Sequence, residues 1–251
     1  MRIRLLLLIS FVLVLSGCQS TPERTAIWAP SDAWWDRHTA QDVEIHLPDG
    51  RTRLLRGGDL YNAREAFIQV SRHARVKATL ALVDNEGINA FAWTEGGEHF
   101  VALTLDTLHQ LGLDQEALGN LLGHELAHLE LRHGELREIR NERANAASTV
   151  LGTVAGAFIP FGGTVVDLGT KAIVNAYSRD EEREADERGM RLASIAGYSP
   201  CGMTRVGDVI KQDNPNASYN FLSTHPNTDD RIKAAQKLAN DRGFGLCSVK
   251  S

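Results

Sequence analysis

The sequence predicts an α+β fold that is mainly helical, with a small antiparallel sheet directly before its most apolar helix. Three short strand-like runs, 78–83, 88–93 and 99–105, are separated by turn sequences, as in a meander. Leucines then recur at helical spacing from Leu118 to Leu129. With 251 residues, 43% of them hydrophobic, the chain can bury a core without obligatory metals or disulfides.

Residues 1–17 have the composition of a secretory signal peptide and are excluded from the fold argument. Two arginines open it, and the uncharged run of eleven residues that follows is too short to span a bilayer. The run ends in Leu-Ser-Gly-Cys18, which resembles a bacterial lipobox and predicts a lipidated Cys18. Multiple acyl chains would anchor the mature protein stably. A plain signal peptide that happens to meet a cysteine is the alternative.

Residues 18–41 show little periodicity and predict a lipidated N-terminus and tether, so the folded domain is expected to span 42–251. Trp34 and Trp35 are expected to pack on that domain, a binding motif being the alternative. The net charge is −5, and the two leader arginines contribute +2 of it, so the mature part carries −7. This balance indicates no nucleic-acid partner.

The domain is expected to begin with a hairpin at 43–55, because residues alternate about a Pro-Asp-Gly turn. A helix with Asp59 as its cap then runs to Arg75. After the acidic stretch 178–186, one helix is expected to end near Ala196.

A further helix is expected to start near Gly202, and a last helix to cover 228–240, after a loop at 212–219. The 23 uncharged residues 144–166 raise the question of a membrane span, but proline and glycines interrupt them, so a helical hairpin is favoured.

The stretch His124-Glu125-Leu-Ala-His128 places two histidines four positions apart, on one face of the helix 118–129. They can therefore offer two imidazole nitrogens to one ion. Glu125 lies about 100° around the helix from His124, which places its carboxylate beside the metal, where it can take a proton from water. A chance match in an amphipathic helix is the alternative.

A third ligand is expected in the acidic helix start 178–186, where Glu182 and Asp186 share a face. Two histidines and a glutamate leave one tetrahedral position open, and Asp186 can hold the far nitrogen of a ligand histidine. A solvated charged face is the alternative. A metzincin would instead have a histidine at position 134, and here His133 is one residue out of register.

With Ser-Thr-His225-Pro and Arg231 downstream, these motifs resemble metallopeptidase family 48 over residues 60–238. That family holds the CAAX prenyl endopeptidases, the HtpX-type heat-shock proteases and the soluble periplasmic BepA/LoiP-type proteases. The resemblance implies a gluzincin-type zincin domain. It also implies one Zn²⁺ per chain with the following roles: ligands His124, His128 and Glu182, general base Glu125, and supporting acid Asp186.

The resemblance further implies a zinc metalloendopeptidase of periplasmic protein quality control, acting on misfolded or unassembled envelope proteins. Cys18 would anchor it at the periplasmic face of the outer membrane. The run Asn89-Ala90-Phe91-Ala92 resembles the family's strand beside the cleft, where a substrate can add as a further strand. A zinc-containing holdase or assembly factor, or a zinc amidase acting on a non-protein amide, remain alternatives.

His225 is expected to reach the site, either by taking the open zinc position or by donating to the developing oxyanion. The resemblance favours a mobile loop that does both, and a histidine that merely caps a turn is the alternative. Arg231 would brace this loop or face the substrate carbonyl. Because lipidation uses Cys18, Cys201 and Cys247 remain as an even pair in an oxidising compartment, and a disulfide between them is expected.

Overall fold

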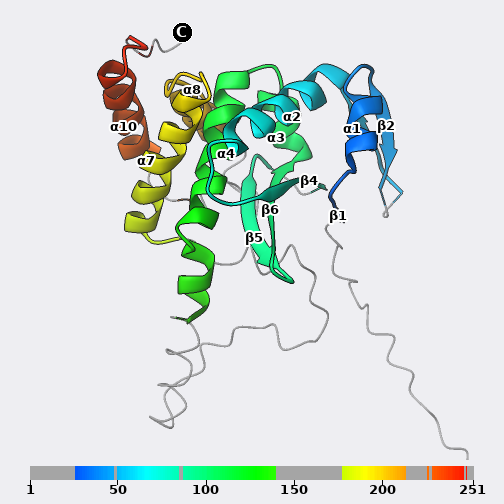
Figure 1. Ribbon diagram of the computed structural model, residues 1–251. Coiled ribbons are helices and arrows are strands. Elements are labelled where there is room, and N and C mark those ends of the chain that lie inside the picture. The colour runs from blue at the N-terminus through cyan, green and yellow to red at the C-terminus, as the bar shows by residue number, and fades with distance from the viewer. Residues whose placement is uncertain are drawn as a thin grey trace, which may run out of the picture.

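The computed structural model describes residues 26–47, 50–84, 87–139, 177–212, 225, 228–245 and 247 (Figure 1). Its strands are β1 (Ala26–Trp28), β2 (Val43–His46), β3 (Thr52–Leu55), β4 (Ala78–Asp84), β5 (Ala90–Glu95) and β6 (Glu98–Thr104). Its helices include α1 (Asp32–His38), α2 (Gly57–Ser71), α3 (Leu105–Leu111), α4 (Gln115–Glu130), α7 (Arg179–Ile195), α8 (Gly202–Gln212) and α10 (Thr228–Asp241), and residues 133–139 are helical as well. The α+β, mainly helical fold class is confirmed. Among the described residues, no helix is both long and apolar enough to cross a bilayer.

The four-stranded sheet has the order β1-β4-β6-β5, so the predicted antiparallel meander is wrong. β6 lies between β4, which it pairs in parallel, and β5, which it pairs antiparallel. Val101, Ala102 and Leu103 of β6 are all fully buried, because both faces of the sheet are covered. β5 lies at the edge, on the side of α4 (Figure 1).

The predicted hairpin is confirmed in its strands, because β2 and β3 pair antiparallel from Val43 opposite Leu55 to His46 opposite Thr52. The end of the predicted tether is folded instead of extended. β1 pairs with β4, and Trp35 of α1 is buried in the main core, as its packing role requires. A three-residue strand and a seven-residue helix are too short to show a periodicity. Residues 1–25, with the predicted signal peptide and Cys18, lie outside the described part.

The expected cap of α2 is wrong. The helix begins at Gly57, whose N–H donates to Asp42 Oδ1 at 3.0 Å, so a carboxylate from the β2 side of the chain satisfies the helix end. Asp59 instead lies in the first turn and pairs with Arg56 at 2.6 Å. α2 also ends earlier than predicted, at Ser71 instead of Arg75.

The ends of α7, α8 and α10 agree with the helices expected near Ala196, near Gly202 and over 228–240. α7 begins with a capping box, in which Ser178 Oγ accepts from the Glu181 N–H and Glu181 Oε2 accepts from the Ser178 N–H. The uncharged stretch 144–166 lies outside the described residues, as does the expected loop after residue 212.

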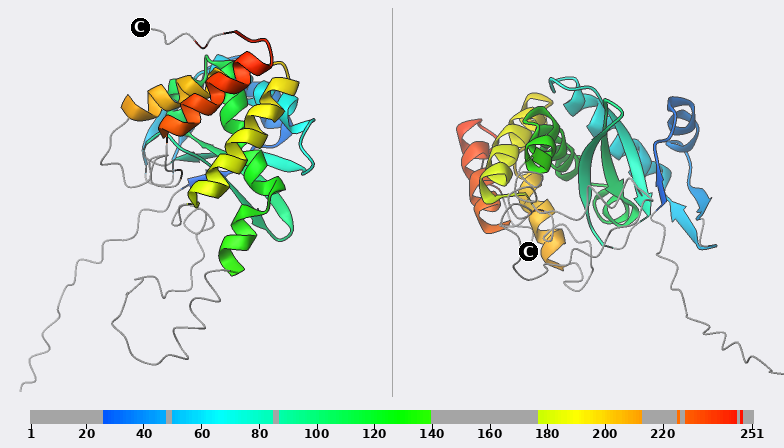
Figure 2. Two further views of the ribbon diagram at one scale, coloured as in Figure 1. Left: turned by 90° about the vertical axis from the view of Figure 1, so that its left-hand side faces the viewer. Right: turned by 90° about the horizontal axis from the view of Figure 1, so that it is seen from below.

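α4 is the central helix, with α7 along one side and the sheet beyond the other (Figure 2). Asp114 caps it by accepting from the Ala117 N–H at 2.9 Å, and every residue from Ala117 to Leu129 is buried. α4 and α7 cross where two glycines meet. A Cβ at Gly123 would lie 2.6 Å from the carbonyl oxygen of Gly189, so no larger residue fits without moving a helix.

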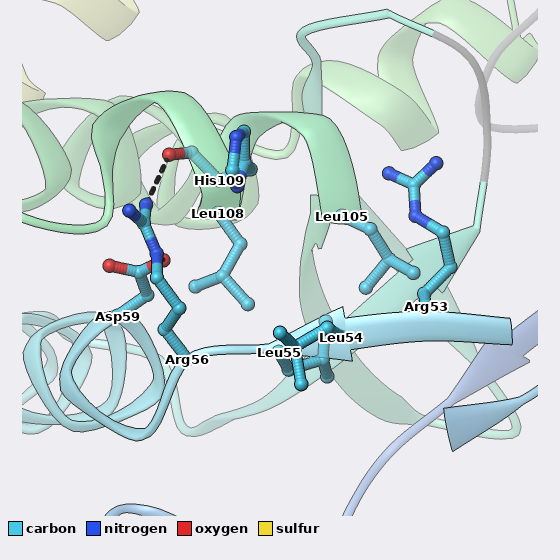
Figure 3. Close-up of a pocket in the computed structure, with 8 residues that line it drawn as sticks. All are labelled: Arg53, Leu54, Leu55, Arg56, Asp59, Leu105, Leu108 and His109. Carbon is cyan, nitrogen blue, oxygen red and sulfur yellow. Dashed lines mark hydrogen bonds and ion pairs between the residues drawn. The ribbon is translucent and has the colours of Figure 1, made fainter. Parts of the chain in front are cut away.

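Two further features lie away from this crossing. A disulfide joins Cys201 to Cys247, with Cα atoms 5.1 Å apart, and ties the end of the chain to the start of α8. A cavity of about 220 Å³ lies between β3 and α3 (Figure 3), lined by Arg53, Leu54, Leu55, Arg56, Asp59, Leu105, Leu108 and His109. Its two arginines already pair with Asp106 and Asp59.

Candidate metal centre

The two histidines of α4 point into the interior, toward α7. His124 is fully buried and His128 is 1% exposed, and their Nε2 atoms lie 3.0 Å apart. The four-residue spacing places both rings on one helix face, and the buried surroundings of α4 hold them there. Burial lowers the pKa of His128 well below its ordinary value, so its ring is held neutral, the form that binds a metal.

Glu182 of α7 completes a three-residue group with these histidines. Its Oε1 lies 3.4 Å from His128 Nε2, and its Oε2 lies 3.6 Å from His124 Nε2. The neighbouring acids face elsewhere, because Glu181 closes the capping box and the side chain of Glu184 is 60% exposed. The crossing of α4 and α7 therefore selects Glu182 from the acidic stretch.

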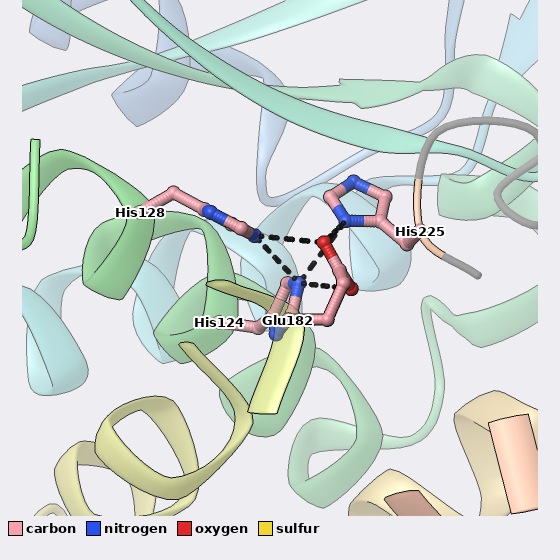
Figure 4. A group of neighbouring side chains, drawn as sticks. All are labelled: His124, His128, Glu182 and His225. Carbon is pink, nitrogen blue, oxygen red and sulfur yellow. Dashed lines mark hydrogen bonds and ion pairs between the residues drawn. The ribbon is translucent and has the colours of Figure 1, made fainter. Parts of the chain in front are cut away.

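His225 is the fourth member of the group (Figure 4). It is 1% exposed, and its Nδ1 lies 3.2 Å from His124 Nε2 and 2.9 Å from Glu182 Oε1. One ligand atom from each of the four residues lies within 4.8 Å of the others.

This set of donors fits a single zinc ion. Two ligands held about 2.0–2.1 Å from a tetrahedral zinc lie about 3.3 Å apart. The separations between neighbouring donors here run from 2.9 to 3.6 Å. Three imidazoles and a carboxylate, all buried and turned toward one point, are the donor types that zinc takes in proteins.

Glu125 lies beside this group without belonging to it. It is fully buried, its Oε1 is 3.5 Å from His225 Nε2, and neither carboxylate oxygen has a hydrogen-bond partner among the described residues. Burial raises the pKa of Glu125, although His225 and His124 oppose the shift. A buried carboxylate without hydrogen bonds costs stability, so its position points to a chemical role.

Asp186 and Arg231 form a layer behind the group. Asp186 Oδ1 lies 2.9 Å from His124 Nδ1, and Arg231 Nε donates to Asp186 Oδ2 at 2.9 Å. Arg231 Nη2 donates to Glu182 Oε2 at 2.6 Å. Burial alone would raise the pKa of both carboxyls, but the positive charge of Arg231 lowers that of Asp186, and His225 and His128 lower that of Glu182.

Arg231 was expected to brace the His225 loop or to face the substrate carbonyl, and its contacts with Asp186 and Glu182 show a different role, which is to hold these two carboxylates in place. It is 2% exposed, so it lies within the protein and not on an open surface. Sequence spacing could not assign these partners, since Arg231 lies 45 and 49 residues from them.

Two residues near His128 were given no role from the sequence. The ring of Tyr177 stacks on His128 with centroids 3.8 Å apart, and His133 Nδ1 lies 2.9 Å from His128 Nδ1. Tyr177 is the residue before the cap of α7, a position that carries no chemical signal. His133 offered a signal in its position five residues after His128, but on a continuous helix that spacing turns it away.

The predicted substrate strand lies at the edge of the sheet. Ala90, Phe91 and Ala92 belong to β5, and Asn89 precedes it. Their side chains are buried, and β5 pairs with β6 on one side while no described strand pairs with its other side.

Comparison with known proteins agrees with this geometry. Residues 61–239 match the family model described as Peptidase family M48. A "Beta-barrel assembly-enhancing protease" of Escherichia coli O157:H7 is 24% identical over 173 residues, which are 63% of this chain and 34% of that relative. A "Putative beta-barrel assembly-enhancing protease" of Vibrio cholerae is 25% identical over 223 residues, 79% of this chain and 44% of that relative.

The chain thus spans less than half the length of these curated relatives. The family match, however, covers most of the chain and includes all four residues of the candidate metal centre. Membership supports metallopeptidase activity, and members of the family typically depend on zinc. This chain belongs to peptidase family M48.

Proposed function

We propose that this protein is a zinc-dependent metalloendopeptidase of the bacterial envelope. The observation that carries the proposal is the buried convergence of His124, His128 and Glu182 on one point, with the unbonded carboxylate of Glu125 beside it. A carboxylate base beside the ligands is what a catalytic zinc site needs and a structural site does not. The fourth donor, His225, would have to leave its position for the site to be catalytic.

His124, His128 and Glu182 would hold the ion, and Asp186 would fix the ring of His124 through its far nitrogen. When bound, zinc supplies a Lewis acid that polarises the scissile carbonyl and makes water more acidic. Glu125 accepts the proton from the attacking water and passes it to the nitrogen of the leaving amine. The raised pKa of Glu125 suits the first step, because a stronger base takes the proton more readily.

The outer edge of β5, with which no described strand pairs, is the proposed place for the substrate. A polypeptide added there would form main-chain hydrogen bonds along Ala90, Phe91 and Ala92. The N–H of Asn89 already donates to the hydroxyls of Thr104 and Thr107, and its carbonyl accepts from the same two residues, so Asn89 would border the substrate strand without pairing with it. Such binding depends on the main chain of the substrate and little on its side chains. It requires an extended segment, which unfolded proteins offer.

His225 is proposed to hold the site inactive by occupying the fourth zinc position and to leave that position when substrate binds. Its Nδ1 stands among the ligand atoms, 3.2 Å from His124 Nε2 and 2.9 Å from Glu182 Oε1, where it could take the fourth position on a bound ion. A substrate carbonyl needs that position, so His225 would have to leave it during turnover, after which it could donate to the developing oxyanion. Binding of substrate would then favour the displaced state.

The names of the two relatives support a role in the assembly or quality control of envelope proteins. We propose misfolded or unassembled envelope proteins as substrates and the periplasmic face of the outer membrane as the location, with Cys18 as lipid anchor. The disulfide between Cys201 and Cys247 supports an oxidising compartment.

The decisive experiment incubates zinc-loaded protein lacking residues 1–18 with an unfolded protein, with and without a chelator. Cleavage should occur, stop on chelation and return with zinc. Glu125→Gln should retain zinc and lose at least about 10³-fold in turnover, since removal of the general base leaves only binding and polarisation. Cleavage by Glu125→Gln at the wild-type rate would contradict the proposal.

The same assay separates the alternatives. A holdase would protect the unfolded protein without cutting it, and its Glu125→Gln variant would still perform the cellular role. An amidase would spare the protein and cleave a small non-protein amide.

Metal analysis of two matched variants tests the third ligand. Glu182→Ala should lose zinc, and Glu184→Ala should retain it, because the Glu184 side chain is exposed and faces His133 instead of the two ligand histidines. If Glu184→Ala lost zinc and Glu182→Ala retained it, Glu184 would be the third ligand instead of Glu182.

A further inference from the structure

We propose that His133 is a positioning residue that fixes the proton and the ring orientation of His128 through an imidazole-to-imidazole hydrogen bond. The inference rests on the proposed zinc site. It concerns the face of His128 that points away from the ion, and it gives a role to a histidine that matches no family ligand pattern.

The two rings meet through their Nδ1 atoms, which are 2.9 Å apart, and both side chains are buried, with exposures of 1% and 2%. His128 Nε2 faces the other donors, so the proton of the neutral ring lies on Nδ1. His128 Nδ1–H therefore donates, and His133 Nδ1 must accept. The proton of His133 then lies on Nε2, which faces Glu184 Oε2 at 3.5 Å.

The backbone is bent at the one place that makes this contact possible. On a continuous helix, residues five apart point about 140° away from each other. α4 ends at Glu130, and Arg132 has a φ of 57°, the left-handed conformation that residues other than glycine rarely adopt. Among the described residues it is the only non-glycine with a positive φ.

The chain resumes helical form at residue 133, so the left-handed residue turns His133 back toward His128. Strained backbone of this kind persists where the surroundings determine it, and it gathers at functional sites. Here its consequence is the contact between the two rings.

The two ligand histidines are supported differently as a result. His124 faces a buried carboxylate, Asp186, which is itself held by Arg231. His128 faces a neutral ring whose own carboxylate, Glu184, is 60% exposed. The stacked ring of Tyr177, 3.8 Å away, fixes the plane of His128 but accepts no proton from its Nδ1. His133 therefore supplies the acceptor that a ligand histidine requires on its far side.

Nuclear magnetic resonance of the zinc-loaded wild-type protein tests the inference directly. Correlation of imidazole nitrogens with ring carbon-bound protons identifies which nitrogen of each histidine carries the proton. The expected result is a proton on Nδ1 of His128 and on Nε2 of His133. A zinc-loaded protein with His133 protonated on Nδ1 would overturn this inference alone, whereas failure to bind zinc would overturn the proposed function with it.

Two variants of similar size separate the acceptor from mere packing. His133→Asn places an amide oxygen where Nδ1 stands, and His133→Leu fills the space without an acceptor. Zinc affinity, measured by competition with a chromophoric chelator, should fall about 10–100-fold for His133→Leu and stay within about threefold of wild type for His133→Asn. Equal loss in both variants, or none in His133→Leu, would overturn the proposal.

The unfolding midpoint of the metal-free variants shows whether each one folds. If His133→Leu does not fold, the tautomers of the wild-type protein still decide. Glu184→Gln serves as the outer control, and because this side chain is exposed, its zinc affinity should match that of the wild type.

Discussion

The crossing of α4 and α7 should be the most sensitive part of the metal centre outside its ligands, and Gly189→Ala tests it. A Cβ at Gly189 would lie 2.6 Å from the backbone nitrogen and Cα of His124 and 2.7 Å from the carbonyl carbon of Gly123. These are backbone atoms, so no side chain can rotate to make room. The helices would have to separate by about 1 Å to reach ordinary contact distances near 3.5 Å.

The expected cost follows from two opposing effects. Overpacking a closely packed interior costs about 1–3 kcal/mol, and the upper end applies where only the backbone can move. Replacing glycine by alanine inside a helix returns about 1 kcal/mol. The net loss in the free energy of unfolding is therefore about 2 kcal/mol. The same separation would carry Glu182 away from His124, while metal sites tolerate displacements of only about 0.2 Å, so zinc affinity should fall as well.

Urea unfolding of the metal-free protein and chelator competition for zinc measure the two effects. Gly58→Ala is the matched control, because a Cβ at Gly58 in α2 meets nothing within 4 Å. That variant should be as stable as the wild type or up to about 1 kcal/mol more stable, with unchanged zinc affinity. If Gly189→Ala behaves like Gly58→Ala in both measurements, the close contact does not position the ligands and the reasoning fails.

Three further predictions concern His225, the disulfide and the end of α4. His225→Ala should retain zinc and change turnover, upward if the residue mainly blocks the fourth position and downward if it mainly donates; unchanged turnover on all substrates would contradict its role. Reduction of the Cys201–Cys247 bond, which closes a loop of sequence separation 46, should cost about 4 kcal/mol, and two free thiols in denatured, unreduced protein would exclude it. Burial would raise the pKa of Glu130, but hydrogen bonds, chiefly from Arg188, outweigh burial and lower this pKa. The ionised carboxylate of Glu130 therefore stabilises the fold above about pH 4.3, and this stabilisation is lost as the pH falls further. The deficit of Glu130→Gln in urea unfolding, about 1 kcal/mol at pH 7, should therefore shrink toward pH 3, and a deficit independent of pH would contradict this.

The helices that carry the chemistry were predictable because their signals are local. The spacing of His124 and His128 places them on one face of any helix, and the leucines around them show that the helix is buried. The acidic start of α7 and the shared face of Glu182 and Asp186 are likewise contained within a few residues. Those signals were enough to propose the ligands, the base and the supporting acid.

The pairing of the strands was not predictable in the same way. Alternation and turn sequences mark where a strand lies, but they do not identify its neighbours, which depend on contacts across the sheet. β6 is an inner strand between β4 and β5, and β5 lies at the edge where a substrate could pair, although residues of both strands are buried. The cap of α2 by Asp42 has the same character, since the donor and acceptor are 15 residues apart.

The sequence by itself determined the face of α4 that carries both histidines, the acidic start of α7 and the even pair of cysteines, because each depends on spacing along the chain or on residue count. Only the tertiary structure decided which acid reaches the histidines, how Arg231 braces two carboxylates, and why His133 meets His128. These depend on the depth of a helix crossing and on one left-handed residue, Arg132, whose conformation is set by the packed surroundings and leaves no periodic trace in the sequence.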